Sequence, residues 1–543
     1  MPCSDCSPPC TVFGKLRNLN PSLFARALCN QAPLDTSQRI ELDELVSQAE
    51  KELTACDEAI FKLQEKIIAF QNQKGTLRDH ISLAKSLVAP IRKCPPEILR
   101  QIFLAHGITN ILGSKRVDIP GFKLMSVCSH WRSIAMATAA LWNDITVSIT
   151  EHDSVWHPSH LPLAEKLLKL SARSLLTVTI DSSRSAASVQ EVPPILPLLC
   201  EQADRWETLS GFCPSKVIWR PLSSLQGRLT SLRTFHLSLP FQKCSICIEG
   251  ASELRALTLH SIEATSTSIP WNRLVQLTIT ESFLSQILQS IAQMPNLLSL
   301  RVLTAKADNR AQFMLPVQSN LVCLTIGVNN ATAEKGSRLL LDRLTLPRLH
   351  LLCFTGTSSH SDFKTNQDEH RWSSIQLPSL ISRSSARITS VILCKIWMPT
   401  SDLISLLQII PSLTSLSITE PPYDDSDTMK PIVTEELLLS IHCHYRHNRE
   451  PLVPRLTSLV LEGCKLSAFS ITTFVEVVQS RWKPLYLVDV DVACIKEVRL
   501  TVSDGLVPFP GVVHMLMVLQ KRGLDVFIKD KDGDVLGKGR DGY

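Results

Sequence analysis

The chain has 543 residues, of which 44% are hydrophobic and 20% charged, and its formal net charge is +5. These values are typical of a globular chain that is long enough for several domains or one long repeat array. The mild charge argues against a nucleic-acid-binding protein, and the absence of a run of about eighteen apolar residues argues against a membrane span. No signal peptide is expected, because a positive region followed by an apolar core is missing at the N-terminus.

The cysteine content predicts a reducing compartment. There are seventeen cysteines, an odd number, and several lie in apolar runs, as do Cys128, Cys323, Cys353 and Cys394. Buried and reduced thiols are the natural interpretation. We therefore expect a cytoplasmic or nuclear protein.

Residues 1–35 are rich in Pro, Ser and Cys and have no sustained periodicity, which predicts a disordered tail. Cys3, Cys6 and Cys10 could ligate zinc, but a structural site needs four ligands and the next cysteine is Cys29. The spacing favours a free tail.

A heptad pattern runs through residues 36–89. One position holds Val46, Leu53, Ile60, Ile67, Ile81 and Val88, and the other holds Leu42, Ala49, Cys56, Leu63, Phe70, Leu77 and Ala84. Such a repeat predicts a long coiled-coil-like helix, with a bend or weak point at Lys74 and Gly75. The helix could mediate self-association or set the geometry of the chain as an arm. It could equally pack back on the helices that follow it.

Residues 90–145 have the pattern of three short helices. Pro95 and Pro96 can open a helix, and Glu97 suits the positive end of its dipole. Apolar stripes of helical period then follow, first Ile98, Leu99, Ile102 and Phe103, and later Leu124, Val127, Cys128, Trp131, Ile134 and Ala135. Gly107 is a plausible helix stop, and the insert 107–121 is expected to be a surface loop. A last apolar element ends with Leu141 and Trp142.

The same residues resemble an F-box, in the F-box-like form common in fungal proteins. The matching positions are Pro95, Pro96, Glu97, Ile98, Leu99, Ile102, Phe103, Val127, Cys128, Trp131, Arg132, Leu141 and Trp142. The family usually has Leu at the position of Cys94, and the insert is longer than in a short F-box. The resemblance implies docking to the Skp-type adaptor of a cullin–RING ubiquitin ligase, with Pro95, Pro96, Ile98, Leu99, Ile102, Phe103, Val127, Cys128, Trp131, Leu141 and Trp142 as adaptor-binding residues. The alternative is a plain three-helix packing unit without a partner.

An internal repeat fills residues 146–543. Its unit is apolar-x-x-apolar-x-apolar, and the copies begin at Leu175, Leu229, Leu254, Leu274, Leu297, Leu321, Leu349, Ile388, Leu413, Leu456 and Ile495, with a degraded copy at Trp206–Leu209. Segments between copies, such as 282–291 and 402–410, have helical spacing. The pattern resembles a divergent leucine-rich-repeat array, in which short strands pair in parallel and stack into a solenoid. An unrelated α/β domain with Leu-rich strands is the alternative.

Three polar clusters could suggest metal or acid–base chemistry. They are His442, Cys443, His444 and His447; Asp424, Asp425 and Asp427; and Asp530, Asp532 and Asp534. The first lacks a carboxylate partner, the second lies in a Pro-bounded loop, and the third lacks the Gly and Glu positions of a calcium loop. We therefore expect no metal and no cofactor. Catalytic motifs such as Gly-x-Ser-x-Gly are also missing, which favours a binding protein over an enzyme.

The sequence thus predicts an α plus α/β chain: a long coiled-coil-like helix, a three-helix F-box, and a leucine-rich-repeat-like solenoid with a parallel sheet. The expected function is that of the substrate-recognition subunit of a ubiquitin ligase, whose repeats bind a target protein. The alternative is a ligase-independent scaffold assembled through residues 36–89.

Overall fold

A computed structural model describes most of the chain. The described residues are 35–113, 116–149, 160–182, 192–212, 216–225, 227–238, 248, 250–262, 269–328, 331–356, 376–396, 398–421, 431–443, 452–482, 492–503, 510–530 and 533–536. They divide into two compact units, with the boundary between Leu99 and Arg100.

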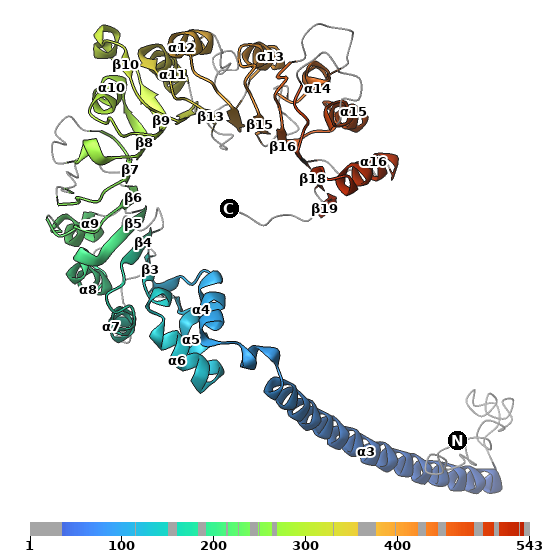
Figure 1. Ribbon diagram of the computed structural model, residues 1–543. Coiled ribbons are helices and arrows are strands. Elements are labelled where there is room, and N and C mark those ends of the chain that lie inside the picture. The colour runs from blue at the N-terminus through green and yellow to red at the C-terminus, as the bar shows by residue number, and fades with distance from the viewer. Residues whose placement is uncertain are drawn as a thin grey trace. The chain divides into compact units, whose positions relative to one another are not determined.

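The first unit is dominated by one helix. Helix α3 (Thr36–Leu87) is continuous (Figure 1), so the predicted long helix is confirmed, and it runs through Lys74 and Gly75, where a bend or weak point was predicted. A single glycine costs about 1 kcal/mol in a helix, which the good helix formers around it can offset. A 3₁₀ turn, η1 (Pro90–Lys93), follows, and α4 (Pro96–Ala105) begins in this unit.

The helices of the predicted F-box segment are α4, α5 (Pro120–Val127), α6 (Ser129–Ala137) and the 3₁₀ turn η2 (Ala139–Leu141). Gly107 has a φ of +59° just beyond α4, as a helix stop requires. The second apolar stripe was expected to lie on one helix, but Cys128 is extended with a φ of −163° and separates α5 from α6.

The insert between α4 and α5 is part of the sheet, so the prediction of a surface loop is wrong. It contains β1 (Asn110–Gly113) and β2 (Val117–Asp118), which pair in antiparallel orientation. Strand β1 also pairs in parallel with β3 (Asp144–Ile149), and both Asn110 and Leu112 are buried. The helical segment is therefore built onto the first strands of the sheet.

From β3 onward the strands of the main sheet pair in the order in which they follow along the chain. They are β4 (Leu176–Ser182), β5 (Trp206–Phe212), β6 (Thr234–Ser238), β7 (Ala256–Leu259), β8 (Gln276–Phe283), β9 (Ser299–Lys306), β11 (Cys323–Gly327), β13 (Leu351–Thr355), β14 (Ser390–Cys394), β15 (Ser415–Thr419), β16 (Ser458–Cys464), β17 (Glu497–Val502) and β18 (Asp525–Asp530). All of these neighbours are parallel, and only the terminal strands β2 and β19 (Gly533–Leu536) pair in antiparallel orientation within this described sheet. Strands β10 (Val317–Gln318) and β12 (Leu344–Thr345) form a separate parallel pair.

The apolar positions of the repeat line up in one buried row across the sheet. The row runs through Ile145, Val178, Leu209, Phe235, Leu257, Leu277, Leu300, Leu324, Leu352, Val391, Leu416, Leu459, Val498 and Val526, each paired with the next. Because side chains alternate along a strand, this register sends every second residue into the core. One predicted copy is shifted: the row takes Phe235 of β6, so the unit there is Leu232-Phe235-Leu237 and does not begin at Leu229.

Helices between the strands cover one face of the sheet and leave the other face open (Figure 1). They are α7 (His160–Leu170), α8 (Ile195–Glu201), α9 (Lys216–Ser223), α10 (Leu284–Ala292), α11 (Ala331–Arg343), α12 (Gln376–Ser384), α13 (Thr400–Gln408), α14 (Glu435–Ile441), α15 (Ile471–Trp482) and α16 (Pro510–Lys521). Short 3₁₀ turns η4 (Ala203–Arg205), η5 (Trp271–Arg273) and η6 (Asn309–Phe313) complete the connections. Among the described residues, none of these helices combines the length and apolarity needed to cross a membrane.

Arginines join successive helices of the sheet's covered face. Arg205 donates to the carbonyl of Ser174 (2.9 Å) after α7, and Arg383 of α12 donates to the carbonyls of Leu341 (2.7 Å) and Leu344. The last carbonyls of a helix have no partner within it, so a guanidinium from the next helix supplies the missing donors.

Arg481 is the most buried of these arginines. Its guanidinium donates to the carbonyls of Ile441 (2.7 Å), Leu452 (2.6 Å) and Val453 (3.1 Å), and burial lowers its pKa. It therefore holds the end of α14, the following connection and α15 together.

We predict that Arg481→Met lowers the free energy of unfolding by about 3 kcal/mol or more, because three buried carbonyls lose their donor. Arg481→Lys keeps the positive charge but not the planar guanidinium group, and it should lose less stability than Arg481→Met. Denaturant unfolding of the full chain measures both. Unchanged stability of the methionine variant would contradict this assignment.

Candidate functional site

Helix α4 exposes an apolar stripe. Ile98 and Ile102 are four residues apart, so they lie on the same face of the helix, and they are 44% and 45% exposed. Pro95 and Pro96, at its start, are exposed as well. The sequence-predicted residues of this group are thus available to a partner.

Four other predicted adaptor-binding residues are buried. Leu99, Phe103, Leu141 and Trp142 are at most 2% exposed. A partner could reach them only if the helical segment opened. Their predicted role as direct contacts is therefore replaced by a role in the core of this segment.

An aromatic contact brings α4 against α6. The ring centroids of Phe103 and Trp131 are 4.9 Å apart, and Trp131 keeps part of its surface exposed. One turn earlier, the Cys128 sulfur accepts a hydrogen bond from the Trp131 backbone N–H (3.4 Å) and so caps α6. Val127, directly before this cap, is 58% exposed. Ile102 and Val127, which precede Phe103 and Cys128 in the chain, are thus exposed near the elements that this aromatic contact joins.

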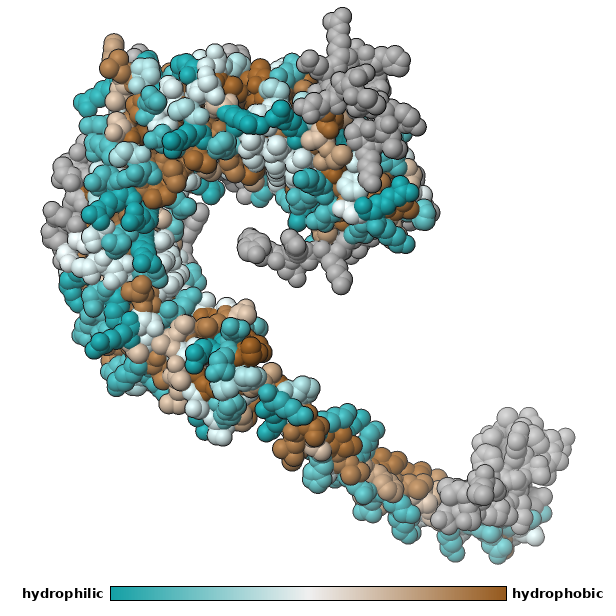
Figure 2. Space-filling view, viewed as in Figure 1, coloured by the Kyte–Doolittle hydropathy of each residue, from teal (hydrophilic) through white to brown (hydrophobic). Residues whose placement is uncertain are grey.

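We define the docking surface, a candidate surface for a partner protein, as Ile102, Val127 and the exposed part of Trp131, all in the second unit. The hydropathy colouring in Figure 2 shows hydrophobic surface over the helical segment α4–α6. Leu104 of α4 and Met136 of α6 are also exposed, and the sequence interpretation did not include them. In the sequence, both could have been noticed as large apolar residues that directly follow a member of a predicted stripe.

The buried Trp142 packs against residues of α5 and α6. Its indole N–H donates to the carbonyl of Ala135 (2.9 Å), and its ring lies 5.7 Å from that of Phe122. A Cβ placed on Gly121 would lie 2.5 Å from the indole ring, so only glycine fits at the start of α5. The amino group of Lys166, on α7, lies 5.0 Å above the Phe122 ring.

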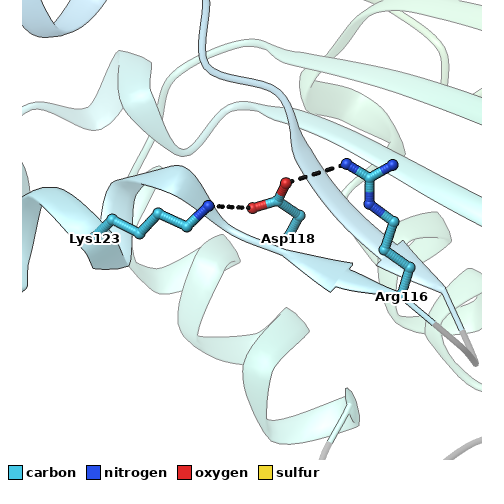
Figure 3. A network of polar contacts seen from close by, with 3 residues as sticks. All are labelled: Arg116, Asp118 and Lys123. Atoms are coloured by element: carbon cyan, nitrogen blue, oxygen red, sulfur yellow. Dashed lines mark hydrogen bonds and ion pairs between the residues drawn. The ribbon is translucent and has the colours of Figure 1, made fainter.

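Polar contacts fix the insert to α5 (Figure 3). Asp118 of β2 accepts from Arg116 (3.2 Å) and from Lys123 of α5 (3.1 Å). The hydrogen bond from Lys123, followed by that from Arg116, lowers the pKa of Asp118. The carboxylate therefore stays ionised at neutral pH and links the strand to the helix.

Asn110 fixes the same insert to the sheet. Its buried amide donates to the carbonyls of Leu141 (3.0 Å) and Asp144 (2.9 Å). One asparagine thus connects β1, η2 and the start of β3. The helical segment is therefore linked to the sheet by the hydrogen bonds of Asn110 as well as by the covalent backbone.

The open face of the sheet is a second candidate surface. Its central row consists of Thr179, Ser210, His236, Thr258, Thr278, Arg301, Thr325, Cys353, Ile392, Ser417, Val460, Arg499 and Phe527, all at least partly exposed. The row contains hydroxyl groups, two arginines, one histidine, one cysteine and three apolar side chains. Such a mixed surface can form both hydrogen bonds and apolar contacts with a protein.

The described cysteines are free thiols in several environments. Cys200 and Cys464 are buried, and burial raises the pKa of Cys200 to about 12. Cys128, Cys323, Cys353 and Cys394 are only partly buried, so their predicted full burial is wrong. For Cys353, burial is the main cause of a raised pKa.

The polar clusters of the sequence fall largely outside the described residues. This is true of Cys3, Cys6, Cys10 and Cys29, of Asp424, Asp425 and Asp427, and of His444, His447 and Asp532. Within the part of the chain that the structure describes, no group of three or more His, Cys, Asp or Glu side chains could hold a metal ion.

Comparison with protein-family models finds no match, and no curated protein matches the sequence significantly. The functional assignment therefore depends on the motif and on the geometry of the two surfaces described above.

We predict that Gly121→Ala destabilises the chain by about 1–3 kcal/mol, because the added methyl group would overlap the buried Trp142 ring. Gly75→Ala is the matched control, since nothing lies within 4 Å of a Cβ there. It should be neutral or slightly stabilising. Thermal unfolding, monitored by circular dichroism, compares the stability of the two variants with that of the native chain. Equal melting curves for Gly121→Ala and the native chain would contradict the tight Trp142 site.

Proposed function

We propose that this chain is the substrate-recognition subunit of a cullin–RING ubiquitin ligase, which docks to a Skp-type adaptor through its helical segment. The observation that carries the proposal is the exposed apolar surface of α4–α6, at the residues where the sequence resembles an F-box. Helices with exposed apolar stripes commonly bind in grooves of a partner protein.

The burial pattern supports this assignment and refines it. Leu99, Phe103, Leu141 and Trp142 form the core that shapes the segment, while Ile98, Ile102 and Val127 remain outside it. An isolated packing unit would gain by replacing these exposed apolar residues with polar ones. Their exposure is more simply explained by a partner that covers them.

We further propose that residues from β3 onward form a leucine-rich-repeat-like solenoid that binds the target protein. Parallel strands paired in chain order, with one apolar row in register, support this architecture. The open face of the sheet, with Arg301, Arg499 and Phe527, would contact the target.

The chain would then promote ubiquitin transfer by positioning the target. The chain would hold a target close to the ubiquitin-charged enzyme brought by the cullin, which raises the effective concentration of the reacting groups. The side chains of this subunit would take no part in bond making or breaking. The rigid connection of the helical segment to β1 and β3 would keep the target at a fixed position relative to the adaptor.

A ligase-independent scaffold is the second candidate. The observation in its favour is α3, whose side chains from Phe61 to Leu87 are all exposed. Such a helix is suited to joining chains whether or not an adaptor binds. The two candidates differ in adaptor capture, which only the first requires.

We predict that Ile102→Asp weakens adaptor binding by about thirty-fold or more, equivalent to roughly 2 kcal/mol, because it places a charge in the apolar docking surface. Phe313→Asp is the matched control: Phe313 is 87% exposed, lies at η6 and should have no effect. Binding of purified full-length chain to purified Skp-type adaptor by calorimetry gives the affinities. Unfolding curves show that both variants are folded.

Leu99→Asp is unsuitable for this experiment, since Leu99 is fully buried and its replacement would disrupt the segment itself. The proposal fails if the native chain does not bind the adaptor, or if Ile102→Asp binds as tightly as the native chain.

A further inference from the structure

Helix α3 has a heptad seam that is exposed from Ile60 onward and only partly exposed at Leu42, Ala49 and Cys56. The first position is occupied by Val46, Leu53, Ile60, Ile67, Lys74, Ile81 and Val88, and the second by Leu42, Ala49, Cys56, Leu63, Phe70, Leu77 and Ala84. Phe70 is 68% and Leu53 64% exposed, although both are large and apolar. Burial of each such side chain is favourable by roughly 1.5–3 kcal/mol, so a seam of this length predicts a helical partner.

The charges that flank the seam change sign along the helix. In the first half they are acidic, at Asp43, Glu50 and Asp57. In the second half they are basic, at Arg78 and Lys85. This asymmetry allows the two possible orientations of a second copy to be compared.

A parallel pair of α3 helices would gain nothing from these charges. In register, Glu52 of one copy would face Asp57 of the other. Like charges at these flanking positions oppose association and select against the orientation that brings them together.

An antiparallel pair reverses this outcome. The acidic half of one helix then lies beside the basic half of the other, with Asp43 opposite Lys85 and Glu50 opposite Arg78. Each of these pairs occurs twice in a symmetric dimer. Lys66 alone would lie beside its own copy, close to the symmetry axis, where solvent screens the repulsion.

The side-chain sizes fit the same alignment. Leu53 lies opposite Leu77, and Ile60 opposite Phe70, near the middle of the seam. Toward the ends, the larger Val46 and Ile81 lie opposite Ala84 and Ala49. In this alignment Lys74 meets Cys56, and its ammonium group can reach Asp57 while its stem covers the seam.

We propose that α3 pairs with α3 of a second copy of this chain in antiparallel orientation, with a twofold axis beside Glu65. In this proposal a second copy of the same chain covers the exposed seam. In this dimer the two Leu87 ends lie roughly 65 Å apart, at 1.5 Å per residue, so the two copies of the following unit are attached at opposite ends of the paired helices. The inference is independent of adaptor docking.

A cross-link tests orientation and register together in the full-length chain. Cys56 and its own copy lie roughly 27 Å apart along the antiparallel pair, whereas they face each other in a parallel one. Lys74→Cys places a thiol opposite Cys56 of the second copy. Dibromobimane, a short thiol-to-thiol cross-linker, should therefore join residues 56 and 74 between chains, as mass spectrometry of the digested covalent dimer would show.

Ile81→Cys is the matched control, because residue 81 lies one heptad away and opposite Ala49. A cross-link between residues 56 and 81 in that variant would overturn the alignment, and one between two copies of Cys56 in the native chain would overturn the orientation. A monomer of 60.4 kDa in light scattering at micromolar concentration would overturn the dimer itself.

Charge reversal gives an independent readout. Glu50→Arg should weaken the dimer by at least tenfold, because it places two cations beside two copies of Arg78, and adding Arg78→Glu should restore it. A parallel pair would not respond in this way, since residues 50 and 78 do not face each other there. Adaptor capture by these variants should equal that of the native chain, which separates failure of the dimer from failure of the proposed function.

Discussion

The pairing of β1 with β3 is the contact on which the arrangement of the larger unit depends. It makes the insert after α4 the beginning of the sheet, and Asn110 secures it with hydrogen bonds to Leu141 and Asp144. A helical segment that could have been a separate module is thereby continuous with the repeat strands. A protein bound to these helices and a protein bound to the sheet would be held at a fixed separation.

The same constraint explains which apolar side chains remain outside. Trp142 fills the space next to Gly121, and Phe103 contacts Trp131. These large side chains therefore pack inside the helical segment. Ile98 and Ile102 lie at the exposed edge of the same apolar stripe of α4. The docking surface is a consequence of the packing behind it, and variants that disturb the core would change it indirectly.

The repeat strands could be predicted from the sequence because a single feature, alternation at fixed spacing, determines both strand position and register. Leu324, Leu352 and Val391 illustrate this, since each follows the same pattern and each pairs with the next. The prediction was shifted at Phe235, where two overlapping matches to the pattern, at Leu229 and Leu232, compete in the sequence.

Other features could not be derived because they depend on residues distant in sequence. A helical stripe shows which face is apolar, but not that Leu99 is buried while Ile98 is exposed. Strand β1 is short and has no partner nearby except β2, so its pairing with β3 could not be foreseen. The arginine contacts between helices, such as Arg481 with Leu452, likewise bridge residues far apart in the chain.

The two associations that we propose both involve exposed apolar helices: one with an adaptor, through α4–α6, and one between copies, through α3. Hydrogen–deuterium exchange of the full chain with and without purified Skp-type adaptor tests the central claim most directly. The account predicts slower exchange in 98–104 and 127–136 and unchanged exchange in the strands β4–β18. Unchanged exchange in those helices at saturating adaptor would contradict it.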